Sequence, residues 1–173
     1  RTVLVDIYKY NYYGENKHIV PIYFLDTNIN SNHIDDQKIT LRLYSGDTEH
    51  RILQEAILGF GGVRLLEMLG YDKIQKYHMN EGHCSFLTLE LLEKFNNNSE
   101  EVRKKCHFTT HTPVSAGHDQ FQVSQCREIL GNLLPKKLNL KSWVNHDILH
   151  MTELGLNFSS SANGVSELHG DVA

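Results

Sequence analysis

The sequence predicts an α/β protein with a doubly wound, mostly parallel sheet. Short apolar or β-prone runs alternate with stretches of helical periodicity, which is typical of that class. Two of the runs, within residues 77–83 and 108–119, lead directly into clusters of His, carboxylate, Asn or Thr beside Gly or Pro. Because the carboxyl ends of parallel strands face one crevice, where ligands bind, we expect these two clusters to form one polar site.

Length and composition predict an ordinary globular domain. The chain has 173 residues, of which 40% are hydrophobic and 22% charged, enough for one domain with a core. The net charge of −4, with both signs interspersed, gives no basic surface for nucleic acid or an anionic membrane. No apolar run approaches the roughly 18 residues of a membrane span, and residues 1–6 lack the layout of a signal peptide. We therefore expect a cytoplasmic protein.

The amino-terminal third predicts strands and loops. Residues 3–8 alternate apolar and polar side chains, as a strand does, and residues 9–17 form a hairpin-like turn. The continuous apolar run 20–25 predicts a central strand covered on both faces, in which Pro21 can stand only at the start. Residues 28–36 predict an exposed loop.

Residues 48–69 predict a long helix, because apolar residues recur there at steps of three and four. Thr48 is the expected cap, with Arg51 and Glu55 on the solvent side. Three glycines inside the helix (Gly59, Gly61 and Gly62) each cost about 1 kcal/mol relative to Ala. Either close packing of the helix backbone or close approach to a ligand offsets that cost, and we favour packing.

The remaining elements alternate between strand and helix. Strands are expected at 74–79 and 106–110, helices at 82–95 and 100–105, with Ser99 capping the latter. Residues 121–134 and 138–149 predict lid or packing helices, residues 151–158 an amphipathic helix, and residues 159–163 a turn or short strand.

His111 is the principal candidate for chemistry. It stands where a strand ends, and Pro113 prevents a helix from beginning there. An imidazole at that place can bind a sugar hydroxyl or move a proton near neutral pH. The alternative is a histidine that only satisfies backbone groups. Glu81 and His83, at the neighbouring strand end, favour a binding site, because carboxylate and imidazole together grip carbohydrate hydroxyls.

The same residue types raise the question of metal and thiol chemistry. Zinc could be bound by His107 with His111, or by Glu81 with His83 and His118, but HExxH spacing is absent and we expect no metal site. The three cysteines, an odd number without CxxC spacing, predict buried or inert thiols and neither a disulfide framework nor a zinc ribbon: Cys84, Cys106 and Cys126.

Several motifs, in the same order over nearly the whole chain, resemble the α-glucan (glycogen and maltodextrin) phosphorylases, most closely the shorter prokaryotic type. They are residues 43–47 with Arg51 and 54–55, residues 80–83, residues 108–114 with 116–119, and residues 163–166 with 168–170. The resemblance implies the two-domain GT-B architecture. Residues 1–173 would be part of its amino-terminal, Rossmann-like domain, and the carboxyl-terminal cofactor-binding domain would lie outside this chain.

The reaction that the resemblance implies is reversible phosphorolysis. Inorganic phosphate cleaves the terminal α-1,4-linked glucose of a glucan or maltooligosaccharide and yields α-glucose 1-phosphate with retained configuration. The implied cofactor is pyridoxal 5′-phosphate, whose phosphate group donates and accepts a proton. The implied partners are the glucan, inorganic phosphate and the carboxyl-terminal domain of the same protein, with a homodimer for the complete enzyme and no nucleic acid or membrane.

The resemblance also assigns roles to residues. His111 matches the histidine that contacts the glucosyl 6-hydroxyl and whose backbone carbonyl lies near the anomeric centre. Asp47 matches an acidic position on the loop that gates the site, Glu81 and His83 match a pair that holds the substrate-side loops, and Thr110 is a further substrate-binding candidate. The lysine that forms the Schiff base and a glycine-rich phosphate loop of the family are not found here. We therefore expect this chain to be part of a longer protein and inactive by itself.

Two other functions stay open from the sequence. One is a nucleotide-sugar glycosyltransferase of the glycogen synthase kind, which shares the architecture but not the motifs at 80–83 and 110–113. The other is a non-catalytic carbohydrate-binding module, which would bind maltooligosaccharides on exposed aromatic side chains; the candidates are Trp143, Tyr8, Tyr10, Tyr12 and Tyr13.

Overall fold

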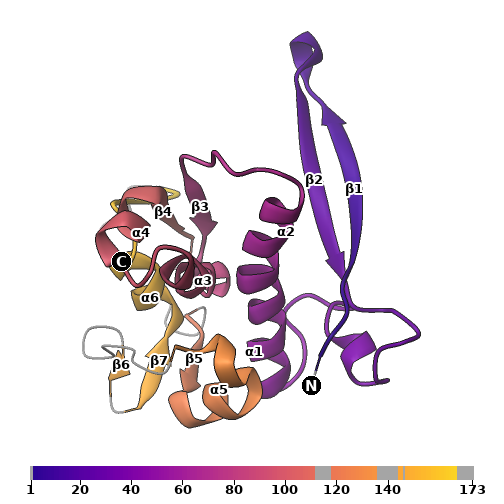
Figure 1. The fold of residues 1–173 in the computed structure, drawn as a ribbon, viewed down its shortest axis with the longest axis vertical. Helices are drawn as coiled ribbons and strands as arrows, with labels where there is room; N and C mark the ends of the chain where they lie inside the picture. Colours follow the sequence, from indigo (N-terminus) through magenta and orange to yellow (C-terminus); the bar gives the residue numbers. More distant parts are fainter. Residues whose placement is uncertain (1, 112–117, 136–143, 146, 167–173) are drawn as a thin grey trace. The chain divides into compact units, whose positions relative to one another are not determined.

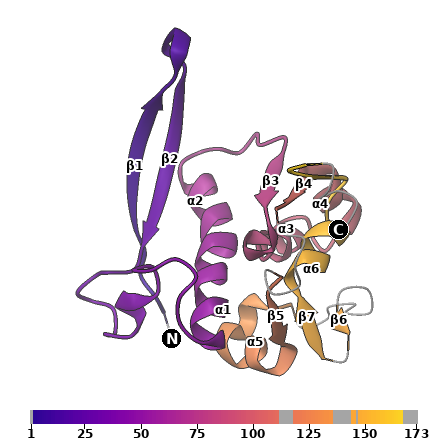
Figure 2. The same cartoon turned by 180° about the vertical axis from the view of Figure 1, so that it is seen from behind.

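The computed structural model describes residues 2–111, 118–135, 144–145 and 147–166. It divides the chain into two compact units, Arg1–Gln54 and Glu55–Ala173, whose elements Figures 1 and 2 label. The assignment of residues 1–173 to a single domain stays a prediction. None of the described helices is long and apolar enough to cross a membrane.

The first unit contains an antiparallel ribbon of two strands, β1 (Asp6–Tyr13) and β2 (Ile19–Asp26). A short 3₁₀ turn, η1 (Glu15–Lys17), joins the strands, and the Gly14 N–H donates to the His18 carbonyl at 2.9 Å. The predicted strand and hairpin are confirmed, but the first strand continues to Tyr13, through residues expected to form the turn.

The prediction that residues 20–25 form a central, doubly covered strand is wrong in its burial. Within the described residues β2 pairs with β1 alone, and Val20 and Phe24 are 54% and 55% exposed. Alternate residues of the apolar run stand opposite tyrosines: the register sets Tyr8, Tyr10 and Tyr12 against Phe24, Ile22 and Val20 on one face of the ribbon. Cross-strand pairs of aromatic and β-branched side chains stabilise such a ribbon without a cover.

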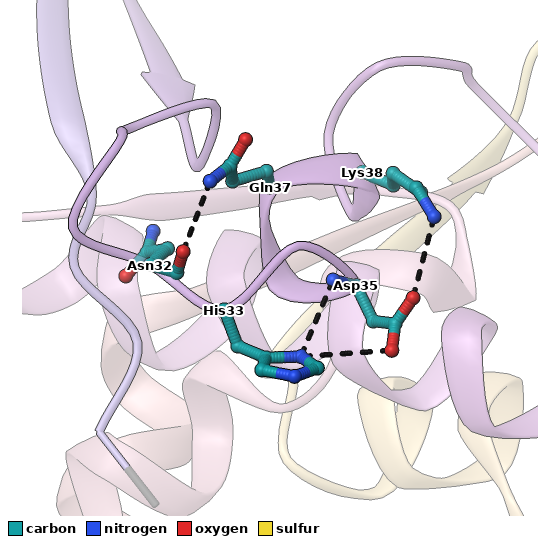
Figure 3. Close-up of polar contacts among 5 residues, drawn as sticks. All are labelled: Asn32, His33, Asp35, Gln37 and Lys38. Carbon is teal, nitrogen blue, oxygen red and sulfur yellow. Dashed lines mark hydrogen bonds and ion pairs between the residues drawn. The ribbon is translucent and has the colours of Figure 1, made fainter.

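Asn32 connects its own loop to Leu4 and to Thr27, the residue after β2, although the sequence predicts an exposed loop there. It is 8% exposed, and its side-chain amide donates to the carbonyls of Leu4 and Thr27, both at 2.8 Å. Figure 3 shows the neighbouring contacts: the Gln37 side chain donates to the Asn32 carbonyl at 2.9 Å, while Lys38 contacts the Asp35 carboxylate at 3.3 Å. His33 and Asp35 remain exposed, so the loop prediction holds for them.

The predicted helix at 48–69 is confirmed as three consecutive segments: α1 (Thr48–Ala56), the π-helix η3 (Ile57–Gly61) and α2 (Gly62–Met68). Its cap is Asp47 and not Thr48, because the Asp47 carboxylate accepts from the His50 N–H at 3.0 Å. Glu55 is 1% exposed, so its placement on the solvent side is wrong. Gly70 follows the helix with φ +79°, a conformation that glycine adopts without strain.

The second unit contains a three-stranded parallel sheet, in agreement with the parallel sheet that the sequence predicts. Its strands are β3 (Tyr77–Asn80), β4 (Cys106–Thr110) and β8 (Ser161–Gly164), in the order β3-β4-β8. Besides α2, the helical elements near these strands in sequence are η4 (Gly82–Cys84), α3 (Leu87–Lys94), α4 (Ser99–Lys105) and α6 (Met151–Asn157). Asn98, and not Ser99, caps α4. An α/β fold is therefore confirmed, whereas double winding and GT-B architecture stay predictions.

The second unit also contains an antiparallel sheet, formed by residues between β4 and β8. It consists of β5 (Gln120–Gln122), β7 (Ile148–His150) and β6 (Val144–Asn145), and α5 (Val123–Leu130) and η6 (Gly131–Leu133) follow β5. The predicted helix at 121–134 is thus largely confirmed. The helix expected around 138–149 is wrong at 144–145 and 148–150, which are strands, and residues 136–143 lie outside the described part.

Gly59 is explained by packing. A Cβ on Gly59 would lie 2.7 Å from the Phe86 Cβ and 2.8 Å from the Leu87 backbone nitrogen, at the start of α3. A Cβ on Gly62, one turn further along the helix, would meet nothing within 4 Å. The helix therefore needs a glycine at position 59 to approach α3, as we favoured from the sequence, and the structure gives no such reason for Gly62.

These two glycines form a matched pair for a stability test. We expect Gly59→Ala to destabilise the chain by about 1–3 kcal/mol, because the new methyl overlaps backbone atoms that cannot rotate away. Gly62→Ala should leave stability unchanged or raise it by up to about 1 kcal/mol, through helix propensity alone. Urea unfolding of both variants measures the difference, and equal effects at the two positions would contradict the packing explanation.

Candidate functional site

Glu81 and His111 follow two neighbouring parallel strands, and the structure brings them together. In the β3-β4 register Asn80 stands opposite Thr109, so the residues that follow the two strands leave the sheet at the same edge. The backbone N–H of His111 donates to Oε2 of Glu81 at 2.6 Å. The prediction that these two residues share one edge of the sheet is therefore confirmed. The hydrogen bond joins the carboxylate to the backbone of His111.

Glu81 adopts a conformation that side-chain-bearing residues avoid. Its φ is 74° and its ψ 173°, a region that costs about 1–3 kcal/mol for a residue other than glycine. Two hydrogen bonds offset this cost, because the Glu81 N–H donates to the Thr109 carbonyl at 2.9 Å while the carboxylate accepts from His111. Since Glu81 is only 6% exposed, its carboxylate acts mainly inside the protein, on the end of β4.

The residues after Glu81 form the tight turn η4, which the start of α6 approaches closely. A Cβ on Gly82 would lie 3.0 Å from the Thr152 nitrogen and 3.1 Å from its hydroxyl oxygen, so a side chain there would push α6 away. His83 lies in this turn and is half-buried, two residues from Glu81. The turn therefore places His83 near the same edge of the sheet.

Thr110 and His111 differ in what they offer to a ligand. Thr110 is 4% exposed, and its carbonyl accepts from the Val165 N–H at 3.1 Å, which ties β4 to the end of β8. Its hydroxyl makes no hydrogen bond within the described residues. His111 is exposed. The substrate-binding roles of Thr110, His111, Glu81 and His83 stay predictions, and residues 112–117 of the same motif lie outside the described part.

Asp47 belongs to the first compact unit. It is exposed and uses its carboxylate as the cap of α1. Each unit is a separate compact body, so the structure leaves the predicted gating role of Asp47 untested.

Sequence reasoning missed a hydrogen-bonded network on one face of the parallel sheet. The Asn163 side-chain oxygen lies 2.8 Å from both His107 Nε2 and Thr109 Oγ1, and His78 Nε2 lies 2.6 Å from the same Thr109 oxygen. The two imidazoles pack edge to face, with ring centroids 4.9 Å apart. The signal was the alternation of side chains in residues 77–80 and 106–110, which places His78, His107 and Thr109 on one face.

The described residues at the carboxyl ends of the three parallel strands do not fit a covalent pyridoxal phosphate site. Such a site needs a lysine amine for the aldehyde and positive charge or backbone N–H groups for the phosphate. Residues 81–84, 111 and 164–166, which follow the three parallel strands, contain neither lysine nor arginine. Lys76 and Lys105 donate to backbone carbonyls before β3 and β4, at the opposite ends of the strands. Nor do the described residues gather three or more His, Cys, Asp or Glu side chains suited to a metal ion.

Cys84 lies next to this edge but is not a nucleophile at neutral pH. Its thiol contacts the Glu81 carbonyl at 3.2 Å, and burial raises the pKa of Cys84 to about 12. Burial likewise raises the pKa of the buried thiols Cys106 and Cys126 to about 12. All three thiols are therefore protonated in the folded protein near pH 8.

Alkylation with iodoacetamide at pH 8 tests this assignment. A pKa near 12 in place of an ordinary thiol value lowers the thiolate fraction about 1,000-fold, so we expect labelling to be slower by about that factor until the chain unfolds in urea. Because burial raises the pKa of the thiols in the folded chain, the free energy of unfolding depends on pH. The contribution of the thiols is fully present below their pKa in the unfolded chain and is lost as pH rises toward 12. Labelling of Cys84 in the folded chain at the rate measured in urea would contradict the assignment.

Comparison with known proteins supports the resemblance seen in the motifs. The maltodextrin phosphorylase of Thermococcus litoralis is 40% identical over 163 residues, covering 88% of this chain and 20% of that protein. The glycogen phosphorylase of Mycobacterium tuberculosis is 36% identical over 181 aligned positions, covering 89% of this chain and 21% of that protein. The glycogen phosphorylase of Aquifex aeolicus is 35% identical over 150 residues, covering 83% and 20%.

No family model matches the sequence. The chain spans about one fifth of the length of the relatives named above, and their identity extends over most of its residues. Over most of its residues the chain is therefore homologous to glycogen and maltodextrin phosphorylases.

Proposed function

We propose that this chain is part of an α-glucan phosphorylase. The whole protein would use inorganic phosphate to cleave the terminal α-1,4-linked glucose of a glucan or maltooligosaccharide, and would release α-glucose 1-phosphate. The observation that carries the proposal is the hydrogen bond between Glu81 and the backbone of His111, since it joins the two motifs that most resemble the family. In the complete protein the edge of the sheet after β3 and β4 would face the sugar.

In this proposal the chain's own residues bind and orient the glucosyl unit. His111 would donate to or accept from the 6-hydroxyl, because it is exposed while its backbone is fixed by Glu81. Glu81 would act as a positioning residue and His83 as part of the same turn. Asp47, on the loop before α1, would have the gating role that the resemblance implies, and Thr110 would support His111 from the end of β4.

Pyridoxal phosphate would be held outside this chain. When bound it supplies a phosphate group that moves a proton, and the described residues after the parallel strands lack the lysine that would bind its aldehyde. The remaining partners would be the glucan, inorganic phosphate and a carboxyl-terminal domain of GT-B type. We also expect the whole protein to be cytoplasmic and to form a homodimer.

The two alternative functions are not favoured. The relatives named above are phosphorylases, and not nucleotide-sugar glycosyltransferases of the glycogen synthase kind. A non-catalytic binding module would need exposed aromatics, and Tyr8, Tyr10, Tyr12 and Tyr13 are indeed more than half exposed on the ribbon. Titration of the chain with maltopentaose separates this last function, since only a binding module should hold the sugar by itself.

The simplest test of the proposal uses the purified chain. Incubated with maltopentaose, inorganic phosphate and pyridoxal phosphate, it should form no glucose 1-phosphate above background, because in this proposal the covalent site for the cofactor lies outside the chain. A maltodextrin phosphorylase in the same assay is the positive control. Glucose 1-phosphate formed by the chain alone would show that the catalytic machinery is complete within it, against the proposal.

A second test concerns His111 in the full-length enzyme. Loss of one hydrogen bond to the sugar in His111→Ala should lower kcat/KM by about tenfold, with the overall fold unchanged. His33→Ala, at an exposed loop position of the first unit, is the matched control and should leave kcat/KM unchanged. Equal kcat/KM for wild type and His111→Ala would remove His111 from the substrate-binding residues.

A further inference from the structure

We infer that Asn163 is a positioning residue that fixes the tautomers of His78 and His107 and holds the last residues of β4 in place. The network lies on one face of the parallel sheet and has no role in the proposed function. Its only link to that function is that Thr109 and Thr110 immediately precede His111. The network itself stands without any assumption about the substrate.

The orientation of the Asn163 amide follows from one contact. Its nitrogen donates to the Gly164 carbonyl at 3.0 Å, and a carbonyl can only accept. The amide oxygen therefore faces the other way, toward His107 Nε2 and Thr109 Oγ1, each 2.8 Å away. An amide oxygen also only accepts, so both of those atoms must carry the hydrogen.

The two tautomers follow in turn. His107 carries its proton on Nε2, so in the neutral ring its Nδ1 accepts from the Ser161 hydroxyl, 2.8 Å away. The Thr109 hydroxyl has only one hydrogen, which it gives to Asn163. His78 Nε2, 2.6 Å from the Thr109 oxygen, must therefore be the donor of that contact. Each donor in this series of hydrogen bonds meets an acceptor, and the series ends at the side-chain oxygen of Asn163.

The network holds the strand that carries His111. The Thr109 hydroxyl donates to the Asn163 side chain in β8. Just after β8, the Val165 N–H donates to the Thr110 carbonyl. On the other side of β4, the Glu81 N–H binds the Thr109 carbonyl. The two residues before His111 are thus held from both neighbouring strands. Among the hydrogen bonds of the described residues, only the Asn163 side chain contacts both His107 and Thr109.

The first experiment reads the tautomers directly in the wild-type chain. Two-bond ¹⁵N–¹H NMR correlations of the neutral rings should show His78 and His107 both protonated on Nε2. A neutral ring of either residue protonated on Nδ1 would overturn the inference, whatever the variants show. This measurement needs no sugar and no cofactor, so its failure is distinct from a failure of the proposed function.

The second experiment replaces Asn163, which accepts hydrogen bonds from both His107 and Thr109. Asn163→Ala should give His107 a mixture of tautomers and speed amide exchange of His111 and Val165 by about tenfold, as expected when one supporting hydrogen bond is lost. Asn163→Asp keeps a side-chain acceptor and should keep His107 protonated on Nε2, which also covers the case that the alanine variant does not fold. Asn157→Ala is the control, because its amide donates to Glu153 within α6. Unchanged tautomers and exchange rates in Asn163→Ala would refute the positioning role.

Discussion

The hydrogen bond from the His111 backbone to the Glu81 carboxylate is the interaction on which the candidate site depends. It crosses between the ends of two parallel strands and directs the chain after β4 toward the turn after β3. Glu81 is buried and its backbone conformation is strained, and both features carry a cost in free energy that this hydrogen bond helps to offset.

Close backbone approach around α6 keeps this edge rigid. A Cβ on Gly155 would lie 2.6 Å from the Phe108 ring and from the Ser85 hydroxyl, and a Cβ on Gly82 would lie 3.0 Å from the Thr152 nitrogen at the start of the same helix. Phe108 is fully buried and belongs to β4. The helix thus presses on the strand that leads to His111 and on the turn that follows Glu81. Such packing holds functional groups in place more precisely than a loop could.

The sequence predicted those features that depend on local pattern. The strand at 106–110 and the helix at 48–69 were found because their apolar residues recur at the periods of strand and helix. The meeting of Glu81 and His111 was predicted because parallel strands end at one edge. In each case a short stretch, or a rule about adjacent strands, contained all the information that was needed.

The failures occur where the outcome depends on distant partners or on near-equivalent neighbours. An apolar run does not tell what covers it, so residues 20–25 were assigned to a buried strand when they pair in an exposed ribbon. Asp47 and Thr48 are both good caps, and only the structure distinguishes them. Single hydrogen bonds of the Asn163 network join residues up to 56 positions apart, and their register comes from the sheet and not from any one segment.

Amide hydrogen exchange at His111 in Glu81→Ala and Glu81→Gln tests the central interaction most directly. If the carboxylate holds the end of β4, the alanine variant should exchange this amide proton at least about tenfold faster than wild type, because its acceptor is lost. The glutamine variant, which keeps a side-chain oxygen, should lie between the two. Equal exchange rates at His111 in the wild type and both variants would contradict the account.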